Sequence, residues 1–238
     1  MTRTNQNQEY VLPEYGGQAT LPTFIGLYRV SSDTVREVIF EGVEITTRFF
    51  KRSFDIMFSS IVMLLGLPIF LAVALITKLS SDGPVFYKQE RIGRNGIPFY
   101  IYKFRSMIVD SEVNGPQLTT DDDSRITPWG KIMRKTHLDE LPQFWNVLKG
   151  EMSIVGPRPE RAYFIRQITE KAPAYWNLLA IKPGITSIGQ VDYGYAENVD
   201  QMVERMSLDL KYLEEVNILT DLEIIFKTVG TMVGAKGK

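Results

Sequence analysis

Two adjacent acidic residues, Asp139 and Glu140, stand out within residues 131–160 of this chain. Leu141 and Pro142 follow directly, and since proline is favoured in the first turn of a helix, the two acids are expected at a helix N-terminus. The free N–H groups and the helix dipole there favour anions, whether carboxylate or phosphate. Two carboxylates together can also hold a hard cation such as Mg²⁺ while one of them stays free to react. Ordinary acidic capping of a helix start is the alternative.

Basic side chains that suit phosphate binding accompany the acid pair. Arg158 stands between Pro157 and Pro159, and because each proline fixes its own φ and restricts the residue before it, the Arg158 side chain is held out with little freedom. A planar guanidinium held in this way suits bidentate binding of phosphate, and a plain surface turn is the other interpretation. The further candidate cations are Lys103, Arg105, Lys131, Arg134 and Lys135.

Two other polar features leave alternatives open. His137 lies two residues before Asp139, where it is a candidate general base or a histidine that serves packing or the surface. Asp121, Asp122 and Asp123 form an acidic run that indicates either a solvated loop or a metal site.

The composition excludes several other classes of protein. The chain has 238 residues, enough for one domain with a core of its own. It contains no Cys and one His, which removes disulfide scaffolds, thiolate zinc sites and Cys nucleophiles and nearly excludes multi-His metal sites. Its 27 Lys and Arg against 28 Asp and Glu give a net charge of -1, so no nucleic-acid partner is expected. Neither a P-loop nor a G-x-G-x-x-G motif occurs, so a nucleotide site of those types has no support.

An apolar segment over residues 56–76 precedes these groups and carries no charge. A straight helix of that length would rise about 32 Å, enough for a hydrocarbon core of about 30 Å. Pro68 follows Gly66 near its middle and is expected to kink or break the helix. A spanning helix should have its basic residues mainly on one side, but here both flanks are basic. A re-entrant hairpin that returns to the same face and a kinked span are therefore both open.

The chain after this segment is expected to form a small α+β domain. Two runs rich in β-branched and aromatic residues, 84–93 and 97–107, flank Asn95 and Gly96, and this pattern predicts a β-hairpin. Apolar periodicity and turn residues predict helices over residues 129–135, 141–148, 160–171, 199–216 and 219–232.

The first 50 residues are expected to stand apart from that domain. Residues 1–22 are polar with scattered Gly and Pro, which is typical of a loosely ordered tail and not of a signal peptide. Residues 32–50 carry helical spacing, either of a packing helix or of a helix on a membrane surface. The expected division is a tail over 1–50, a membrane helix over 51–80 and a cytosolic catalytic domain over 81–238.

From Lys51 to about Val229 the sequence resembles the bacterial sugar transferases, the monotopic phosphoglycosyl transferases. The resemblance rests on five blocks in order, of which the third is long and specific: KRSFD, DGPVFYKQERIGRNGIPFYIYKFRSM, LDELPQFWNVLKGEMSIVGPRPE, KPGITSIGQV and LDLKYLEE. It implies a re-entrant membrane helix, with its break mapping onto Pro68. Members often have Ser before that proline and this chain has Leu67, so Gly66 and neighbouring structure must satisfy the freed backbone groups here.

The same resemblance implies transfer of a sugar 1-phosphate from a UDP-sugar to polyprenyl (undecaprenyl) phosphate, with release of UMP, at the start of exopolysaccharide, capsule or other glycan assembly. The catalytic, Mg²⁺-binding dyad of the family maps onto Asp139 and Glu140, and Asp139 would form a covalent phosphosugar–aspartate intermediate. Arg158, with Lys103 and Arg134, would bind substrate phosphate. The implied location is the cytoplasmic face of the bacterial inner membrane, with the phospholipid bilayer as a partner and a homodimer left open.

Two rival interpretations remain at this point. One is a single-step transferase in which Asp139 or Glu140 acts only through Mg²⁺ or as a base. The other is a non-enzymatic membrane anchor whose small domain recruits partners of glycan assembly.

Overall fold

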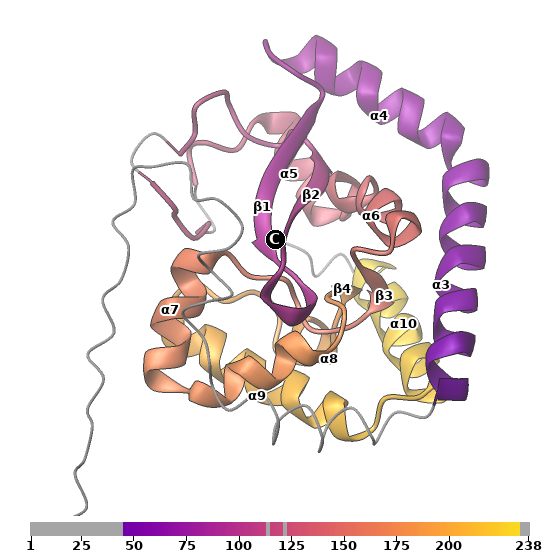
Figure 1. Cartoon of the computed structure of the whole chain (residues 1–238). Coiled ribbons are helices and arrows are strands. Elements are labelled where there is room, and N and C mark those ends of the chain that lie inside the picture. The colour runs from indigo at the N-terminus through magenta and orange to yellow at the C-terminus, as the bar shows by residue number, and fades with distance from the viewer. Residues whose placement is uncertain (1–44, 113–114, 121–122, 234–238) are drawn as a thin grey trace, which may run out of the picture.

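The computed structural model describes residues 45–112, 115–120 and 123–233 (Figure 1). Within this part the chain folds into helices and two small sheets, so the expected mixed α+β class is confirmed. The tail expected over residues 1–22 and most of the helix expected over 32–50 lie outside the described residues.

Two apolar helices, α3 (Ile45–Leu65) and α4 (Leu67–Ser80), meet at Gly66 and are bent by 62° relative to each other. Pro68 lies in the first turn of α4, where a missing N–H leaves no helical bond unmade. Gly66 keeps the backbone satisfied without a serine, because its N–H donates to the Val62 carbonyl at 2.8 Å and its carbonyl accepts from the N–H four residues later at 2.9 Å. A Cβ at this position would lie 2.4 Å from the Val62 carbonyl oxygen, so the turn requires glycine. The expected break is therefore confirmed, beside Pro68.

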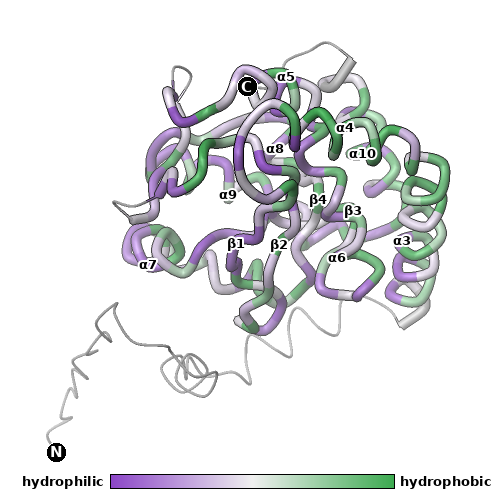
Figure 2. The backbone as a smooth tube through the Cα atoms, turned by 90° about the horizontal axis from the view of Figure 1, so that it is seen from above, coloured by the Kyte–Doolittle hydropathy of each residue, from purple (hydrophilic) through white to green (hydrophobic). Residues whose placement is uncertain are grey.

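The bent pair has an apolar surface that the rest of the described chain does not cover. No single helix in the described residues is long and apolar enough to cross a membrane, but α3 and α4 together meet the requirement of length and composition. Hydrophobic residues follow α4 and much of α3 in Figure 2. Those more than half exposed include Leu64, Leu65, Leu67, Ile69, Leu71, Leu75 and Leu79. An apolar patch of this extent is typical of a surface that meets a membrane or a partner.

Buried polar contacts fasten the start of α3 to the remaining domain. Asp55 is buried, and its Oδ1 accepts hydrogen bonds from Ser153 Oγ at 3.1 Å and from Ile154 N at 2.9 Å. Lys51 Nζ donates to the Val155 carbonyl at 2.9 Å and forms an ion pair with Asp221. Helix α3 runs without interruption across residues 50 and 51, where the boundary was expected, and the contacts of Lys51 and Asp55 lie after it.

The expected hairpin is present at the centre of the molecule (Figure 1). Strands β1 (Phe86–Ile92) and β2 (Pro98–Phe104) pair antiparallel, with Phe86 opposite Phe104 and Ile92 opposite Pro98. Asn95 and Gly96 both have positive φ in the connecting loop, which is the backbone conformation that the Asn-Gly signal predicts.

A second sheet was not expected from the sequence. Strands β3 (Ser153–Val155) and β4 (Gly184–Thr186) pair in parallel, with Ser153 opposite Gly184. A Cβ on Gly184 would lie 2.2 Å from the Gly156 nitrogen, so this glycine permits the close approach of the two segments. Strands of three residues are too short to show a periodicity, and their pairing depends on contacts between distant segments.

The other helices match the expected ones with small shifts at their ends: α5 (Pro128–Lys135), α6 (Gln143–Lys149), α7 (Ala162–Lys171), α9 (Val199–Glu214) and α10 (Ile218–Val233). The short helices that were not foreseen include η3 (Pro173–Ala180) and α8 (Ile188–Asp192). Apolar clusters lie on either side of the hairpin: one joins α7, η3 and α9 to the end of β1, and one joins β2, α6, β3 and α10. The hairpin and the segment after β3 are therefore held between two packed layers.

Candidate active site

The acid pair lies in a tight reversal of the chain between α5 and α6. His137 has a φ of 56°, a left-handed conformation, and directs the chain into a single 3₁₀ turn, η2 (Leu138–Glu140). The N-cap of α6 is Pro142, so Asp139 and Glu140 lie just before this helix and not in its first turn. Both carboxylates are buried, with 5% and 8% of their surface exposed.

A cavity of about 560 Å³ opens onto this turn. Its lining includes all five residues that were expected at the reacting phosphate: Lys103, Arg134, Asp139, Glu140 and Arg158. They come from β2, α5, η2 and the loop after β3, so the fold brings together side chains from four segments. The volume is in the range of small-molecule sites. Pro68 does not line the cavity, which agrees with its expected role in the helix break.

Glu140 is the anionic centre of an ion-pair network. Its Oε1 lies 2.5 Å from Lys103 Nζ and 3.5 Å from a terminal nitrogen of Arg158. Burial raises the pKa of the Glu140 carboxyl, but the charges of Lys103 and Arg158 lower it by more, so that the pKa falls below its ordinary value. Glu140 is therefore ionised at neutral pH.

Asp139 has the opposite electrostatic situation. Burial, chiefly, and the neighbouring charge of Glu140 raise the pKa of the Asp139 carboxyl, and Lys103 offsets this only in part. Among the hydrogen bonds of the described residues none is made to the Asp139 carboxylate, so its oxygens are not committed to the protein. Two adjacent carboxyl groups whose pKa values are pushed apart are typical of catalytic pairs with different roles.

The loop that carries Arg158 is fixed by the second sheet. Gly156 N donates to the Thr186 carbonyl at 3.1 Å, and Gly184 N donates to the Pro157 carbonyl at 3.0 Å. A Cβ on Gly156 would lie 2.4 Å from the Lys182 carbonyl oxygen, so only glycine fits at the start of the loop. The rigid presentation expected of Arg158 from its two prolines is therefore reinforced by a strand that the sequence did not predict.

Comparison with known proteins identifies the family of this chain. Residues 46–235 match the family model described as bacterial sugar transferase. The chain belongs to the bacterial sugar transferase family. The match includes the bent helix pair, the cavity and the acid pair, and it confirms the resemblance inferred from the five sequence blocks.

The relatives of this chain include two proteins whose names give undecaprenyl phosphate as a substrate. The chain is 42% identical over 189 residues to the UDP-N-acetylgalactosamine-undecaprenyl-phosphate N-acetylgalactosaminephosphotransferase of Aeromonas hydrophila. This alignment covers 79% of the chain and 45% of that protein. It is 40% identical over 184 residues to the UDP-glucose:undecaprenyl-phosphate glucose-1-phosphate transferase of Escherichia coli K12, with 76% of this chain and 40% of that protein covered. It is 42% identical over 186 residues to the exopolysaccharide production protein PSS of Rhizobium leguminosarum bv. phaseoli, with 75% and 92% covered. The chain thus spans less than half of the first two relatives.

The acid pair of this chain supplies only part of a set of ligands for Mg²⁺. Within the described residues no group of three or more His, Cys, Asp and Glu side chains is placed to hold a metal ion. Mg²⁺ commonly takes one or two carboxylates together with waters and substrate phosphates. Asp139, with uncommitted oxygens, and Glu140, through the oxygen outside its ion pair, supply such a partial set. This donor set is compatible with Mg²⁺ whose remaining ligands are waters and substrate phosphate, and Mg²⁺ stays a prediction.

The other basic residues that were expected near the acid pair differ in where they lie. Arg134 lines the cavity, with its Nε donating to Ser106 Oγ at 3.0 Å. Arg105 also lines it, but its guanidinium donates at 2.7 Å to the carbonyls of Ser81 and Asp82 and so holds the end of α4. The two exposed lysines of α5, Lys131 and Lys135, lie outside the cavity lining.

The structure gives neither His137 nor Asp123 a contact that indicates a catalytic role. The His137 ring lies parallel to the Tyr195 ring at 6.4 Å and is not part of the cavity lining, so its candidate role as a base stays a prediction. Asp121 and Asp122 lie outside the described residues, while Asp123 is buried in an ion pair with Arg125 at 2.5 Å.

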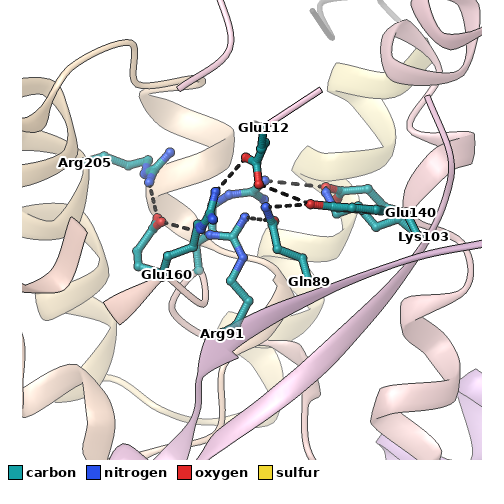
Figure 3. Close-up of polar contacts among 10 residues, drawn as sticks. Gln89, Arg91, Lys103, Glu112, Glu140, Glu160 and Arg205 are labelled. Carbon is teal, nitrogen blue, oxygen red and sulfur yellow. Dashed lines mark hydrogen bonds and ion pairs between the residues drawn. The ribbon is translucent and has the colours of Figure 1, made fainter. Parts of the chain in front are cut away.

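Sequence reasoning missed a second polar group in the cavity, drawn in Figure 3. Glu160 lies between Arg91 of β1 and Arg205 of α9, and all three line the cavity. A signal was available in α9, where Arg205 and Asp209 are buried on the same face as Met202 and Met206. A charged pair one helical turn apart on an apolar face points to a buried polar partner, but the sequence does not say which one.

Proposed function

We propose that this chain transfers a sugar 1-phosphate from a UDP-sugar to polyprenyl phosphate and so begins the assembly of a polysaccharide. The names of its relatives support this class of substrates, with undecaprenyl phosphate as the acceptor of two of them. The observation that carries the proposal is the Asp139 carboxylate, which is buried in a cation-lined cavity and receives no hydrogen bond from the described residues. A carboxylate left unbonded in this way is suited to act as a nucleophile.

In the first step an oxygen of the ionised Asp139 carboxylate attacks the phosphorus atom that bears the sugar. A bond from the Asp139 oxygen to phosphorus forms, and the bond from that phosphorus to the bridging oxygen of the diphosphate breaks. The electron pair leaves with UMP, and a phosphosugar–aspartate intermediate remains on the enzyme.

In the second step an oxygen of polyprenyl phosphate attacks the same phosphorus atom. The bond between phosphorus and the Asp139 oxygen breaks, and its electron pair restores the carboxylate. The product is a polyprenyl diphosphate sugar. No oxidant, reductant or net proton is needed in either step, because both leaving groups depart as anions.

The cations of the cavity are placed to stabilise the charge of the transferring phosphoryl group. Arg158, on its fixed loop, offers a planar fork to two phosphate oxygens, while Lys103 and Arg134 add charge from β2 and α5. Mg²⁺ held by Asp139 and Glu140, when bound, would supply further neutralisation of phosphate charge. Glu140 holds Lys103 beside the dyad and remains anionic throughout.

The bent helix pair supports a re-entrant attachment to the membrane. The start of α3 is held by Asp55 and Lys51, and the end of α4 is held by Arg105, all in contacts with one and the same domain. A helix pair whose two ends both return to one domain has its ends on the same side of a bilayer. We place that domain at the cytoplasmic face of the inner membrane, where a soluble UDP-sugar and a lipid-embedded acceptor can meet.

A panel of UDP-sugars with undecaprenyl phosphate, in which UMP release is measured, tests this function. We expect one or more of the sugars to release UMP only with the wild-type chain, and Asp139→Asn to reduce the rate by at least 1,000-fold, as about 4 kcal/mol of lost transition-state stabilisation would. A membrane scaffold without activity would release no UMP with any sugar, and its cellular function would survive the Asp139→Asn substitution.

A further inference from the structure

The cavity contains a second cationic group beyond the acid pair. Arg205 donates to Glu160 Oε1 at 2.5 Å, and Arg91 lies 3.4 Å from Glu160 Oε2 and donates to Gln89 Oε1 at 2.6 Å. Figure 3 shows Glu160 between the two guanidinium groups, with Glu140 and Lys103 on the far side of the group. Both arginines are held in place by one carboxylate, and each of them contacts a different one of its two oxygens.

Arg91 and Arg205 each have N–H groups that Glu160 and Gln89 do not use. A guanidinium has five N–H groups, and Glu160 and Gln89 use one or two on each arginine. The Arg91 side chain is 14% exposed and that of Arg205 is 8% exposed, and both line the cavity. A single carboxylate between two guanidiniums leaves a net positive charge at this end of the site.

The positive charge of the cavity as a whole exceeds what its carboxylates balance. Eight Lys and Arg side chains line it against five Asp and Glu, and one of the eight, Arg125, is already paired with Asp123 outside the lining, which leaves an excess of two. Burial lowers the pKa of Arg91 to about 10, with Glu160 opposing that effect and the like charges of Arg158 and Arg161 adding to it. The arginines are therefore crowded together, and an anionic ligand would relieve their mutual repulsion.

The position of Arg91, Glu160 and Arg205 relative to the acid pair indicates how a diphosphate ligand would be oriented in the cavity. Glu160 follows Arg158 by two residues, and the Glu160 carbonyl accepts a hydrogen bond from Ile92 N at 2.9 Å, which fixes the segment to β1. Arg158 contacts Glu140 at 3.5 Å, whereas Glu160, two residues further along the same segment, contacts Arg91 and Arg205. A diphosphate whose reacting phosphorus lay at Asp139 and Arg158 would therefore extend its second phosphate toward Arg91 and Arg205, which line the same cavity.

We propose that Arg91 and Arg205, positioned by Glu160, form a second phosphate subsite that holds the phosphate of the nucleoside monophosphate leaving group. The inference rests on the proposed function, since it takes a nucleoside diphosphate sugar as the substrate. The subsite binds the departing phosphate as its charge develops, while Arg158 and the acid pair act on the phosphate that is transferred. A purely structural ion-pair network is the competing interpretation, and it predicts no effect on nucleotide binding.

Binding of UMP and of uridine to the purified full chain, measured by titration calorimetry, tests the subsite without turnover. We expect the wild-type chain to bind UMP at least tenfold more tightly than uridine. Arg205→Lys keeps a positive charge beside Glu160 but loses the planar fork, so it should weaken UMP binding about tenfold and leave uridine binding unchanged. Arg91→Lys should act in the same direction and serves as the second variant if Arg205→Lys lowers the melting temperature.

Two controls separate the subsite from neighbouring effects. Arg166 on α7 lies outside the cavity lining, and Arg166→Lys, the same chemical change, should bind UMP like the wild-type chain. Arg158→Lys should slow UMP release from a UDP-sugar far more than it weakens UMP binding, because its phosphate is the transferred one.

The results that overturn the subsite differ from those that overturn the function. Equal affinities for UMP and uridine in the wild-type chain, or unchanged UMP binding in stable Arg205→Lys and Arg91→Lys proteins, would refute the subsite. Selective loss of UMP affinity in Arg158→Lys alone would put the nucleotide phosphate at the acid pair and would also refute it. Failure of every UDP-sugar to release UMP would refute the proposed function, while the binding measurements would still decide the subsite.

Discussion

Asp139 and Glu140 are neighbours in the chain, but their surroundings push their pKa values in opposite directions. Lys103 and Arg158 both contact Glu140, whereas no hydrogen bond within the described residues reaches the Asp139 carboxylate. Glu140 therefore stabilises the folded state. Asp139 destabilises it, because its buried negative charge is only partly compensated by neighbouring positive charges. Such a division is common where activity requires a destabilised group.

Substitutions of the two acids should change stability with opposite signs. The raised pKa of Asp139 means that the folded state binds its proton more tightly than the unfolded state, so ionisation at pH 7 opposes folding. Asp139→Asn should therefore raise the melting temperature by about 2–4 °C, as about 1 kcal/mol would in a protein of this size. Glu140 has a lowered pKa and stabilises the fold above its unfolded pKa, so Glu140→Gln should melt earlier by at least as much. Thermal melts at pH 7 that shift in the same direction would contradict this assignment.

The acid limb of the pH profile reports on the same carboxyl group. Because the pKa of Asp139 is raised, kcat/KM for the UDP-sugar should fall with decreasing pH around a midpoint above the ordinary carboxyl value of about 4. Lys103 is the main charge that lowers this pKa, so Lys103→Met should move the midpoint to still higher pH, besides reducing the rate. A midpoint that moves to lower pH in this variant would show that another group controls the limb.

Arg158 should not be replaceable by lysine. The guanidinium is held on a loop fixed by β4, and an ammonium lacks its planar fork. Loss of one bidentate contact should cost about 2–4 kcal/mol of transition-state stabilisation, which reduces kcat/KM by roughly 30- to 1,000-fold in both Arg158→Lys and Arg158→Ala. Wild-type rates in a stable Arg158→Ala protein would remove Arg158 from the site.

Among the structural elements, the turn between α3 and α4 sets the angle at which the apolar helix pair would enter a membrane. Gly66 allows the bend of 62°, and contacts from both ends of the pair return to the same domain. The sequence signals, Gly66 with Pro68 and basic residues on both flanks, were sufficient to predict the break. They could not decide between a hairpin and a kinked span, because the contacts of Asp55 and Arg105 join segments far apart in the chain.

Cysteine labelling can test this topology cleanly, since the native chain contains no cysteine. Phe50, before the apolar segment, and Asp82, after it, are both exposed. Single Phe50→Cys and Asp82→Cys variants in membrane vesicles should react with an impermeant thiol reagent from the same, cytoplasmic side. Labelling from opposite sides would require a spanning pair and would discard the re-entrant arrangement.

At the scale of the whole molecule, local signals predicted more than long-range ones. The hairpin at Asn95, the helix starts and the acid pair each depend on a few neighbouring residues, and the structure contains them. The pairing of β3 with β4 and the contact of Glu160 with Arg205 join segments tens of residues apart. These two contacts form only when the helices and sheets pack against each other, and a single sequence without an alignment does not predict that packing.

The proposed mechanism requires a covalent phosphosugar–aspartate intermediate, and the mass of the intact chain would reveal it. The chain would be incubated with a UDP-sugar that supports UMP release, without polyprenyl phosphate, and then denatured and weighed by mass spectrometry. We predict a gain of one sugar phosphate on the wild-type chain, located on Asp139 by peptide mapping, lost on addition of polyprenyl phosphate and absent from Asp139→Asn. UMP release that requires the acceptor, with no mass gain at any time, would contradict the account and establish a single-step transfer.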